Sequence, residues 1–411
     1  MSEPSQTGVH RPNRAGAFVH QQGGPDGFSA FVPSPLPPTP ELDMTRLGGL
    51  LERAATSLGR LDGLARGVNA DRLLYMYVRK EAVLSSQIEG TQSTLSELLE
   101  YENAETPGTP LDDVREVSRY VSALRLAIES IRNGMPLSLR LIRETHRELM
   151  SGGRGSAQAP GEFRHSQNWI GGTRPSTARY VPPPAHELLR VLGDLERFIV
   201  DGRESPIVKA GLAHAQFESI HPFLDGNGRV GRLLITAILC EQRSLREPFL
   251  YLSLYFKQHR EDYYAYLQRV RTDGDWESWM AFYLEGVDWT ARQAAATATE
   301  LVSLFETDTE RIHAAKLSRS ALKVFKYLEE HVIVSIARTA RATGLSIPTV
   351  TSALNGLAHL AIAREITGKR HGRLFAYTRQ LEIMNNSGDA PIEVESTRTE
   401  VWLQGFDRSA P

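Results

Sequence analysis

Twelve residues near the middle of the chain concentrate groups that could handle a nucleotide polyphosphate. The segment His221-Pro-Phe-Leu-Asp-Gly-Asn-Gly-Arg-Val-Gly-Arg232 holds a candidate base, a carboxylate and two arginines. Gly226 and Gly228 allow the backbone to approach an anion closely, because they carry no Cβ. Arg229 and Arg232 lie three positions apart, so on a helix both guanidinium groups leave the same face and suit successive phosphates. The segment therefore predicts a phosphate-binding loop.

The elements on either side of this loop must position its side chains. An apolar run, 233–239, follows the loop and predicts a helix whose first turn begins near Gly226. The unpaired N–H groups and the positive end of that helix would then face the bound anion. Phe223 is predicted to pack into the core and to anchor the loop.

The segment resembles the signature loop of Fic domain proteins, His-x-Phe-x-(Asp/Glu)-Gly-Asn-Gly-Arg-x-x-Arg, at every fixed position. The approach to it, 213–220, is also similar to that family. The resemblance implies transfer of AMP from ATP to a Ser, Thr or Tyr hydroxyl of a target protein. His221 would be the catalytic general base, and Asp225 would bind Mg²⁺. The residues that the resemblance assigns to ATP are Gly226, Asn227, Gly228, Arg229, Arg232 and, in the segment 260–264, Tyr263 and Tyr264.

A second motif bears on regulation. Ser85-Ser-Gln-Ile-Glu89-Gly90 fits the family's inhibitory pattern, (Ser/Thr)-x-x-x-Glu-(Gly/Asn), on the helix that contains residues 73–83. Pairing of Glu89 with Arg232 would deny that arginine to the γ-phosphate. Read by itself, Glu89 is a surface carboxylate of a helix. The alternative enzymatic role is removal of AMP from a modified protein, with Glu89 orienting the attacking water.

The segment 163–184 predicts two short strands, 167–170 and 178–181, joined by a glycine-rich turn. Such a hairpin could present an open edge to an extended peptide, or it could be a solvent-facing excursion. In Fic proteins a flap of this kind borders the active site, which implies a target-positioning role for Thr177, Ala178, Arg179 and Tyr180.

The C-terminal region predicts helices followed by a basic hairpin, and it resembles a winged helix-turn-helix. Residues 318–380 contain ten Lys and Arg against three Asp and Glu, although the whole chain has a net charge of −2. This local excess suits a DNA backbone, whereas the alternative is a module for protein contacts or dimerisation. A DNA-binding regulator with a ligand-sensing Fic domain is a further alternative, against which the intact His221 and Asp225 argue.

The fold class that these patterns predict is mainly α, a Fic-type helical bundle with a short β-hairpin flap and a C-terminal winged helix-turn-helix. A length of 411 residues requires more than one domain, and a single cysteine, Cys240, fits a reducing compartment. Neither a signal peptide nor a membrane-spanning run is visible, so a cytoplasmic location is expected. The resemblance to Fic proteins implies a homodimer. The predicted parts are an extended Pro/Gly-rich segment (1–40), a helical region carrying the inhibitory helix (41–135), the Fic catalytic domain (136–290), a linker helix (291–317), the winged helix-turn-helix (318–384) and a flexible tail (385–411).

Overall fold

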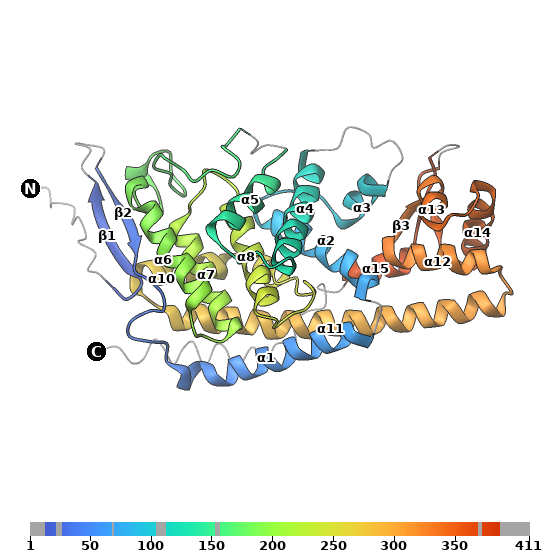
Figure 1. Ribbon diagram of the computed structural model, residues 1–411, viewed down its shortest axis with the longest axis horizontal. Coiled ribbons are helices and arrows are strands. Elements are labelled where there is room, and N and C mark those ends of the chain that lie inside the picture. Colours follow the sequence, from blue (N-terminus) through green and yellow to red (C-terminus); the bar gives the residue numbers. More distant parts are fainter. Residues whose placement is uncertain are drawn as a thin grey trace, which may run out of the picture. The chain divides into compact units, whose positions relative to one another are not determined.

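The computed structural model describes residues 13–21, 27–67, 70–103, 112–152, 157–368 and 372–386. The chain divides into two compact units, residues 1–292 and 293–411 (Figure 1). The first twelve residues of the predicted N-terminal segment, the predicted tail beyond residue 386 and the tip of the basic hairpin at 369–371 lie outside the described residues.

The N-terminal unit is built almost entirely of helices, which confirms the prediction of a mainly α fold. None of the helices in the described ranges is long and apolar enough to cross a membrane. The helices of this unit are α1 (Met44–Gly67), α2 (Ala70–Ile88), α3 (Leu95–Asn103), α4 (Asp112–Arg132), α5 (Leu139–Leu149), α6 (Leu188–Asp201), α7 (Pro206–Ile220), α8 (Asn227–Glu241), α9 (Ser253–Gln258), α10 (Arg260–Asp273) and the first part of α11 (Trp276–Ala314).

The central helix of this unit is α7. Every residue from Ile207 to Ile220 is buried, including polar side chains such as His214 and Glu218. A helix that is covered on all sides must lie inside the bundle. Its neighbour α8 is buried from Val230 to Leu239 and packs beside it (Figure 1). The loop between these two helices is therefore held at both ends by the core.

The N-terminal segment contains a β-hairpin that the sequence analysis did not predict. Strands β1 (Gly16–Gln21) and β2 (Phe28–Pro33) pair antiparallel, with Phe18 opposite Phe31 and their ring centroids 5.1 Å apart. The Pro- and Gly-rich composition suggested an unpaired extended chain. Aromatic and β-branched residues instead pack across the strands, which stabilises a hairpin.

The predicted flap strands at 167–170 and 178–181 do not form, and that prediction was wrong in detail. Ile170 and Tyr180 make one antiparallel bridge, and a short 3₁₀ helix, Pro175–Thr177, occupies the turn. Pro175 is the first residue of this 3₁₀ helix, where its fixed φ and missing N–H are tolerated. Phe31 of β2 donates its N–H to the Val181 carbonyl at 2.9 Å, so the N-terminal hairpin supports this loop.

The C-terminal unit has an α-helical part and one small sheet. Helix α11 continues without a break past residue 291, where the linker helix was predicted to begin. The elements that follow it are α12 (Arg319–His331), β3 (Ile333–Ser335), α13 (Ile336–Thr343), α14 (Ile347–His359), β4 (Arg364–Glu365), β5 (Leu374–Ala376) and α15 (Thr378–Asn386). The sheet is antiparallel, with strand order β3-β5-β4. Val324, Leu354 and Phe375 are buried between helices and sheet.

Candidate active site

His221 is the residue at which α7 ends. Its backbone has φ 49° and ψ 62°, and its N–H donates to the Phe217 carbonyl. The His221 carbonyl accepts from Arg164 Nε at 3.0 Å and from Asn168 Nδ2 at 3.3 Å. A left-handed conformation is unfavourable for a residue with a side chain, so these bonds fix it in place. Arg164 and Asn168 were not singled out from the sequence.

The environment of His221 keeps its imidazole neutral. Burial lowers the pKa of His221 to about 3, and the nearby positive charges of Arg271 and Arg164 lower it further than burial alone would. A neutral imidazole is the form that accepts a proton from a hydroxyl group. Because this pKa is well below the ordinary histidine value near 6.5, the His221 imidazole stays neutral, and able to accept a proton, in acidic solution as well.

We expect the His221 imidazole to remain neutral from pH 8 to pH 5, because its pKa is lowered to about 3. Histidine-labelled protein titrated by NMR would check this, with the His221 signal assigned by its loss in His221→Ala. An inflection of that signal near the ordinary histidine pKa would contradict the burial of the base.

The loop after His221 is closed by its own amide side chain. Asn227 Oδ1 accepts the Phe223 N–H at 2.8 Å, and Asn227 Nδ2 donates to the Phe223 carbonyl at 2.9 Å. The ring of His146 stacks on Phe223 at 3.7 Å between centroids, and its Nε2 bonds to the Asp225 carbonyl. Gly226, with φ 78°, then begins α8. The Asn227 side chain thus shapes the loop that leads into α8.

Arg232 is buried and is held by the end of α2. Its Nε donates to Ser85 Oγ at 2.8 Å, and its Nη2 donates to the Ser85 carbonyl at 2.9 Å and to Glu89 Oε1 at 2.6 Å. Ser85 lies in the last turn of α2, and Glu89 follows the end of that helix. The two sequence motifs, separated by more than a hundred residues, therefore meet.

The Glu89 carboxylate also covers the beginning of α8. A Cβ on Gly228 would collide with Glu89 Oε1, which places that oxygen directly against the glycine backbone. Burial acts to raise the pKa of Glu89, but the Arg232 guanidinium outweighs it and leaves the pKa below its ordinary value. The carboxylate is therefore ionised at neutral pH, and a negative group occupies the anion-binding end of the helix.

Arg229 has a partner that sequence reasoning missed. Its Nη1 lies 2.5 Å from Glu116 Oε1 of α4, and both side chains are buried. Its Nη2 is 3.8 Å from Asp225 Oδ1. The two arginines therefore have different partners, Glu116 of α4 for Arg229 and the end of α2 for Arg232. No local pattern around Glu116 signals this pairing across 113 residues.

We expect Glu116→Ala to lower the free energy of unfolding by about 3–5 kcal/mol, because it removes the buried carboxylate that pairs with the buried Arg229 guanidinium. The matched control is Glu129→Ala on the same helix, whose carboxylate pairs with Arg125 in an exposed position. That control should change stability by less than about 1 kcal/mol. Urea unfolding would measure the free energy of unfolding of both variants. Equal losses would show that the Arg229–Glu116 pair does not stabilise the fold more than an exposed ion pair does.

The two tyrosines assigned to the nucleotide differ in accessibility. Tyr263 is fully buried, donates to or accepts from His214 Nε2 at 2.9 Å, and stacks on Phe256. Its ring belongs to the core. Tyr264 is only partly buried, and Glu89 and Arg232 both act on its pKa, which burial raises. Of the pair, Tyr264 is the more accessible.

The flap residues also differ among themselves. Thr177 and Arg179 are exposed and Ala178 is half-buried, whereas Tyr180 is buried. The Tyr180 hydroxyl donates to the Ser219 carbonyl at 2.5 Å, and the Arg271 guanidinium lies 4.0 Å from its ring centre. Tyr180 thus anchors the flap to the end of α7, and the three residues before it form the accessible part.

Asp225 is the residue that could hold a divalent cation. Its side chain is about half exposed, and its Oδ1 accepts the Gly226 N–H at 2.6 Å. Among the residues that the structure describes, no cluster of three or more His, Cys, Asp or Glu could form a complete metal cage. A single carboxylate completed by phosphate oxygens and water is a common Mg²⁺ arrangement, and Asp225 fits it.

Comparison with known families agrees with this geometry. Residues 136–239 match the Fic/DOC family model, and residues 49–129 match the Fic/DOC family N-terminal model. The first match contains the whole loop, and the second contains Ser85 and Glu89. The chain is a Fic domain protein.

Curated relatives of this Fic domain protein are similar over part of their length. A protein adenylyltransferase Fic from Drosophila ananassae is 31% identical over 201 residues, which is 47% of this chain and 37% of that protein. One from Drosophila grimshawi is 28% identical over 242 residues, 56% of this chain and 47% of that protein. The chain thus spans less than half the length of these relatives.

A solved structure supports the fold. A Fic family protein from Desulfovibrio desulfuricans superposes with a TM-score of 0.52 at 20% identity, covering 80% of this chain and 95% of that one. At this identity the match establishes a Fic-like fold.

Proposed function

We propose that this Fic domain protein transfers AMP from ATP to hydroxyl groups of target proteins and of itself, and that Glu89 restrains the transfer. The observation that carries the proposal is geometric: one short loop joins His221, at the end of α7, to the N-terminus of α8. A base and an anion-binding helix end at one loop suit a reaction between a hydroxyl and a phosphate ester. The name of the curated relatives, protein adenylyltransferase, favours the same reaction.

In this proposal the neutral imidazole of His221 accepts the proton of a Ser, Thr or Tyr hydroxyl. The hydroxyl oxygen forms a bond to the α-phosphorus, and the bond from that phosphorus to the oxygen of pyrophosphate breaks. AMP then remains on the target as a phosphodiester, and pyrophosphate leaves with its electron pair. Proton removal by a well-placed base contributes about 10²–10⁴ in rate.

The other residues of the loop would position ATP and stabilise charge. The backbone N–H groups of Gly226, Asn227 and Gly228 would bind phosphate oxygens at the start of α8. Arg229 and Arg232 would neutralise charge on the leaving pyrophosphate. Asp225 would hold Mg²⁺, which when bound neutralises part of the charge of the phosphates. The half-exposed position of Asp225 supports this role.

Glu89 would restrain the transfer because its carboxylate and the phosphates of ATP compete for the same hydrogen-bond donors. Glu89 and Ser85 occupy three donor positions of Arg232, and the Glu89 carboxylate lies against Gly228. A triphosphate that needs these donors must displace an ionised carboxylate. A charge-assisted bond of this kind contributes about 1.5–3 kcal/mol, enough to keep the resting activity low.

Removal of AMP from a modified protein is the second candidate reaction at this site. It is favoured by the nearness of Glu89 to His221, since the Glu89 carboxylate acts to raise the pKa of that imidazole. A carboxylate there could orient a water molecule towards a phosphodiester. Glu89→Gln would weaken this hydrolysis while it strengthens transfer, which separates the two reactions.

The reaction type is tested by incubating Glu89→Gly protein with ATP labelled at either the α- or the γ-phosphate. Transfer of AMP predicts that only the α-label stays on the protein and that pyrophosphate is released in equal amount. Retention of the γ-label would show phosphoryl transfer and overturn the proposal. Absence of both labels from the protein and from an added cell extract would also contradict it.

The proposal extends to the rest of the chain. We propose that residues 318–384 form a winged helix-turn-helix, supported by the order α12-β3-α13-α14-β4-β5 and by the basic balance of the segment. A homodimer and a reducing, cytoplasmic location are also proposed, the first on the family likeness and the second on the single cysteine.

A further inference from the structure

We propose that Arg271 is a positioning residue for the transfer reaction, which holds the flap in place relative to His221. The N-terminal strap, defined as residues 13–21 and 27–33, supports this arginine and the flap together. The inference rests on the proposed AMP transfer, because it concerns the position of the acceptor hydroxyl. Both family models that match the chain begin after the strap, at residues 49 and 136.

Arg271 is attached to the end of the helix that carries the base. It lies in the last turn of α10 and is buried, with 6% of its surface exposed. Its Nη2 donates to the Glu218 carbonyl at 3.1 Å, and its Nε donates to Ser219 Oγ at 3.2 Å. Both acceptors belong to the last turn of α7, whose negative end suits a positive side chain. The arginine is therefore fixed two residues before His221.

The guanidinium of Arg271 also contacts the flap. Its Cζ lies over the Tyr180 ring, 4.0 Å from the ring centre, which is within the range of a cation–π contact. The Tyr180 hydroxyl donates to the Ser219 carbonyl at 2.5 Å. Tyr180 is buried and directly follows the accessible flap residues 177–179. One arginine and one tyrosine thus join the flap to the chain just before the base.

The charge of Arg271 is not explained by packing. Within the described ranges, no carboxylate forms an ion pair with it, and its hydrogen bonds go to a carbonyl, a hydroxyl and the Gln268 side chain. Arginine is seldom buried unless it is paired with a carboxylate. An apolar side chain of similar volume would fill the position without the desolvation of a charge. We therefore assign the guanidinium to the contacts that it makes with Tyr180 and with α7.

The N-terminal strap holds this pair from two sides. Asn13 Nδ2 donates to the Arg271 carbonyl at 3.1 Å and to the carbonyl that follows it at 2.9 Å, so it closes the end of α10. Phe31 donates its N–H to the Val181 carbonyl, and its ring centre lies 6.3 Å from that of Tyr180. The paired strands β1 and β2 connect these two attachments. Movement of the flap away from α10 therefore requires the strap to release one of them.

These contacts bear on the geometry of transfer. The acceptor hydroxyl must lie within hydrogen-bond reach of His221, and a displacement of about 1 Å can lower the rate about 10²-fold. The flap would align the acceptor, whereas ATP would bind at the start of α8. The contacts of Arg271 with other elements go to α7 and to the flap. Loss of Arg271 should therefore slow the transfer without weakening ATP binding.

Initial rates of α-label incorporation, measured over a range of ATP concentrations in the Glu89→Gly protein, test the role of Arg271. Arg271→Met nearly keeps the volume and removes the charge, so it should lower kcat by about 10- to 100-fold and leave the KM for ATP unchanged. Arg269→Met is the matched control. That arginine lies on the same helix, is exposed and also lies over a tyrosine ring. It should keep the rate of the Glu89→Gly protein.

A double-mutant cycle tests whether Arg271 acts through Tyr180. Tyr180→Leu should lower kcat in the same way, because it removes both the ring and the hydroxyl. If the two residues act as one contact, the Arg271→Met, Tyr180→Leu protein should be no slower than the slower single variant. Independent contributions would instead multiply.

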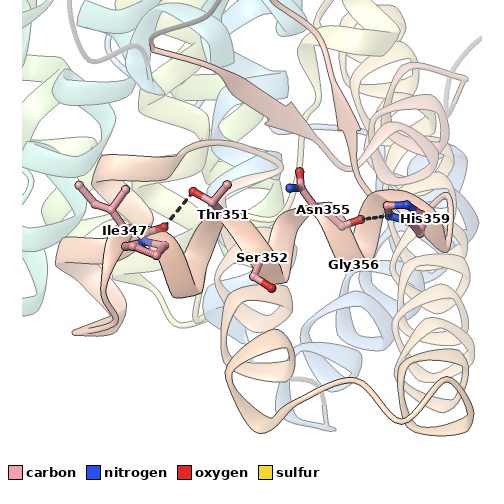
Figure 2. A pocket seen from close by; sticks show the side chains of 7 residues that line it. Ile347, Thr351, Ser352, Asn355, Gly356 and His359 are labelled. Carbon is pink, nitrogen blue, oxygen red and sulfur yellow. Dashed lines mark hydrogen bonds between the residues drawn. The ribbon is translucent and has the colours of Figure 1, made fainter.

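Asn13→Ala tests the strap and carries the test should Arg271→Met not fold. It should lower kcat by less than Arg271→Met does, again without a change in the KM for ATP. Asn355→Ala is the matched control and should have no effect. That asparagine is exposed on α14 of the other unit, where it lines a shallow depression (Figure 2).

Three results would overturn the inference. The first is that Arg271→Met is as active as Arg269→Met, or Asn13→Ala as active as Asn355→Ala. The second is a rise in the KM for ATP as large as the fall in kcat, which would assign Arg271 to the nucleotide site. The third is a double variant whose loss is the product of the single losses. In each case label still enters the Glu89→Gly protein and the proposed AMP transfer stands. Absence of label from that protein would overturn both.

Discussion

Replacing Glu89 by glycine is expected to raise self-modification with ATP by roughly 10- to 150-fold, the range that a lost charge-assisted bond of about 1.5–3 kcal/mol allows. The Glu89 carboxylate bonds to Arg232 at 2.6 Å and lies against Gly228. Its removal frees a buried guanidinium and uncovers the start of α8. Incorporation of α-labelled ATP into the purified protein would measure the change.

Two further variants show whether the effect comes from this carboxylate. Glu100→Gly makes the same substitution at an exposed position of α3 and should leave activity unchanged. Ser85→Ala removes one of the three contacts of Arg232 and should give a smaller gain than Glu89→Gly. Equal activity in the wild type and Glu89→Gly would refute the restraint.

Replacing His221 in the Glu89→Gly protein is expected to lower the rate by about 10²–10⁴, because the hydroxyl then loses its base. The left-handed backbone at His221, with φ 49°, means that alanine also introduces strain. His221→Asn removes this ambiguity, since asparagine tolerates that conformation but is not a base. Both variants should be inactive, which initial rates of α-label incorporation would measure.

ATP affinity distinguishes a lost base from a damaged site. The phosphate-binding groups follow His221 at the start of α8, and the loop is closed by Asn227 and not by the imidazole. Calorimetric ATP binding by the His221→Asn, Glu89→Gly protein should therefore match that of Glu89→Gly alone. His186→Ala, on an exposed histidine, is the matched control for both measurements. Full activity without His221 would show that another group is the base.

The loop and its helix were predictable because their information is local. Twelve consecutive residues contain the base, the carboxylate and the helix start, and α8 begins at Asn227, next to the predicted position. The pairing of Glu89 with Arg232 was anticipated through a sequence pattern, although it joins distant parts of the chain. Local spacing and a specific motif were sufficient for these features.

Features that depend on the packing of distant elements were not predictable. The Glu116 carboxylate meets Arg229 only because α4 packs against α8. The contacts of Tyr263 with His214 and Phe256 likewise depend on how α10 packs against α7 and α9. The hairpin at 16–33 depends on cross-strand contacts such as Phe18 with Phe31, which the Pro-rich composition obscured.

The central claim is AMP transfer by His221 under restraint by Glu89, and intact-mass spectrometry after incubation with ATP and Mg²⁺ tests it most directly. The Glu89→Gly protein should gain the mass of AMP on a hydroxyl side chain. The wild type should gain far less, and the Glu89→Gly, His221→Asn protein should gain none. An equal mass gain in the wild type and Glu89→Gly, or a gain that persists without His221, would contradict the account.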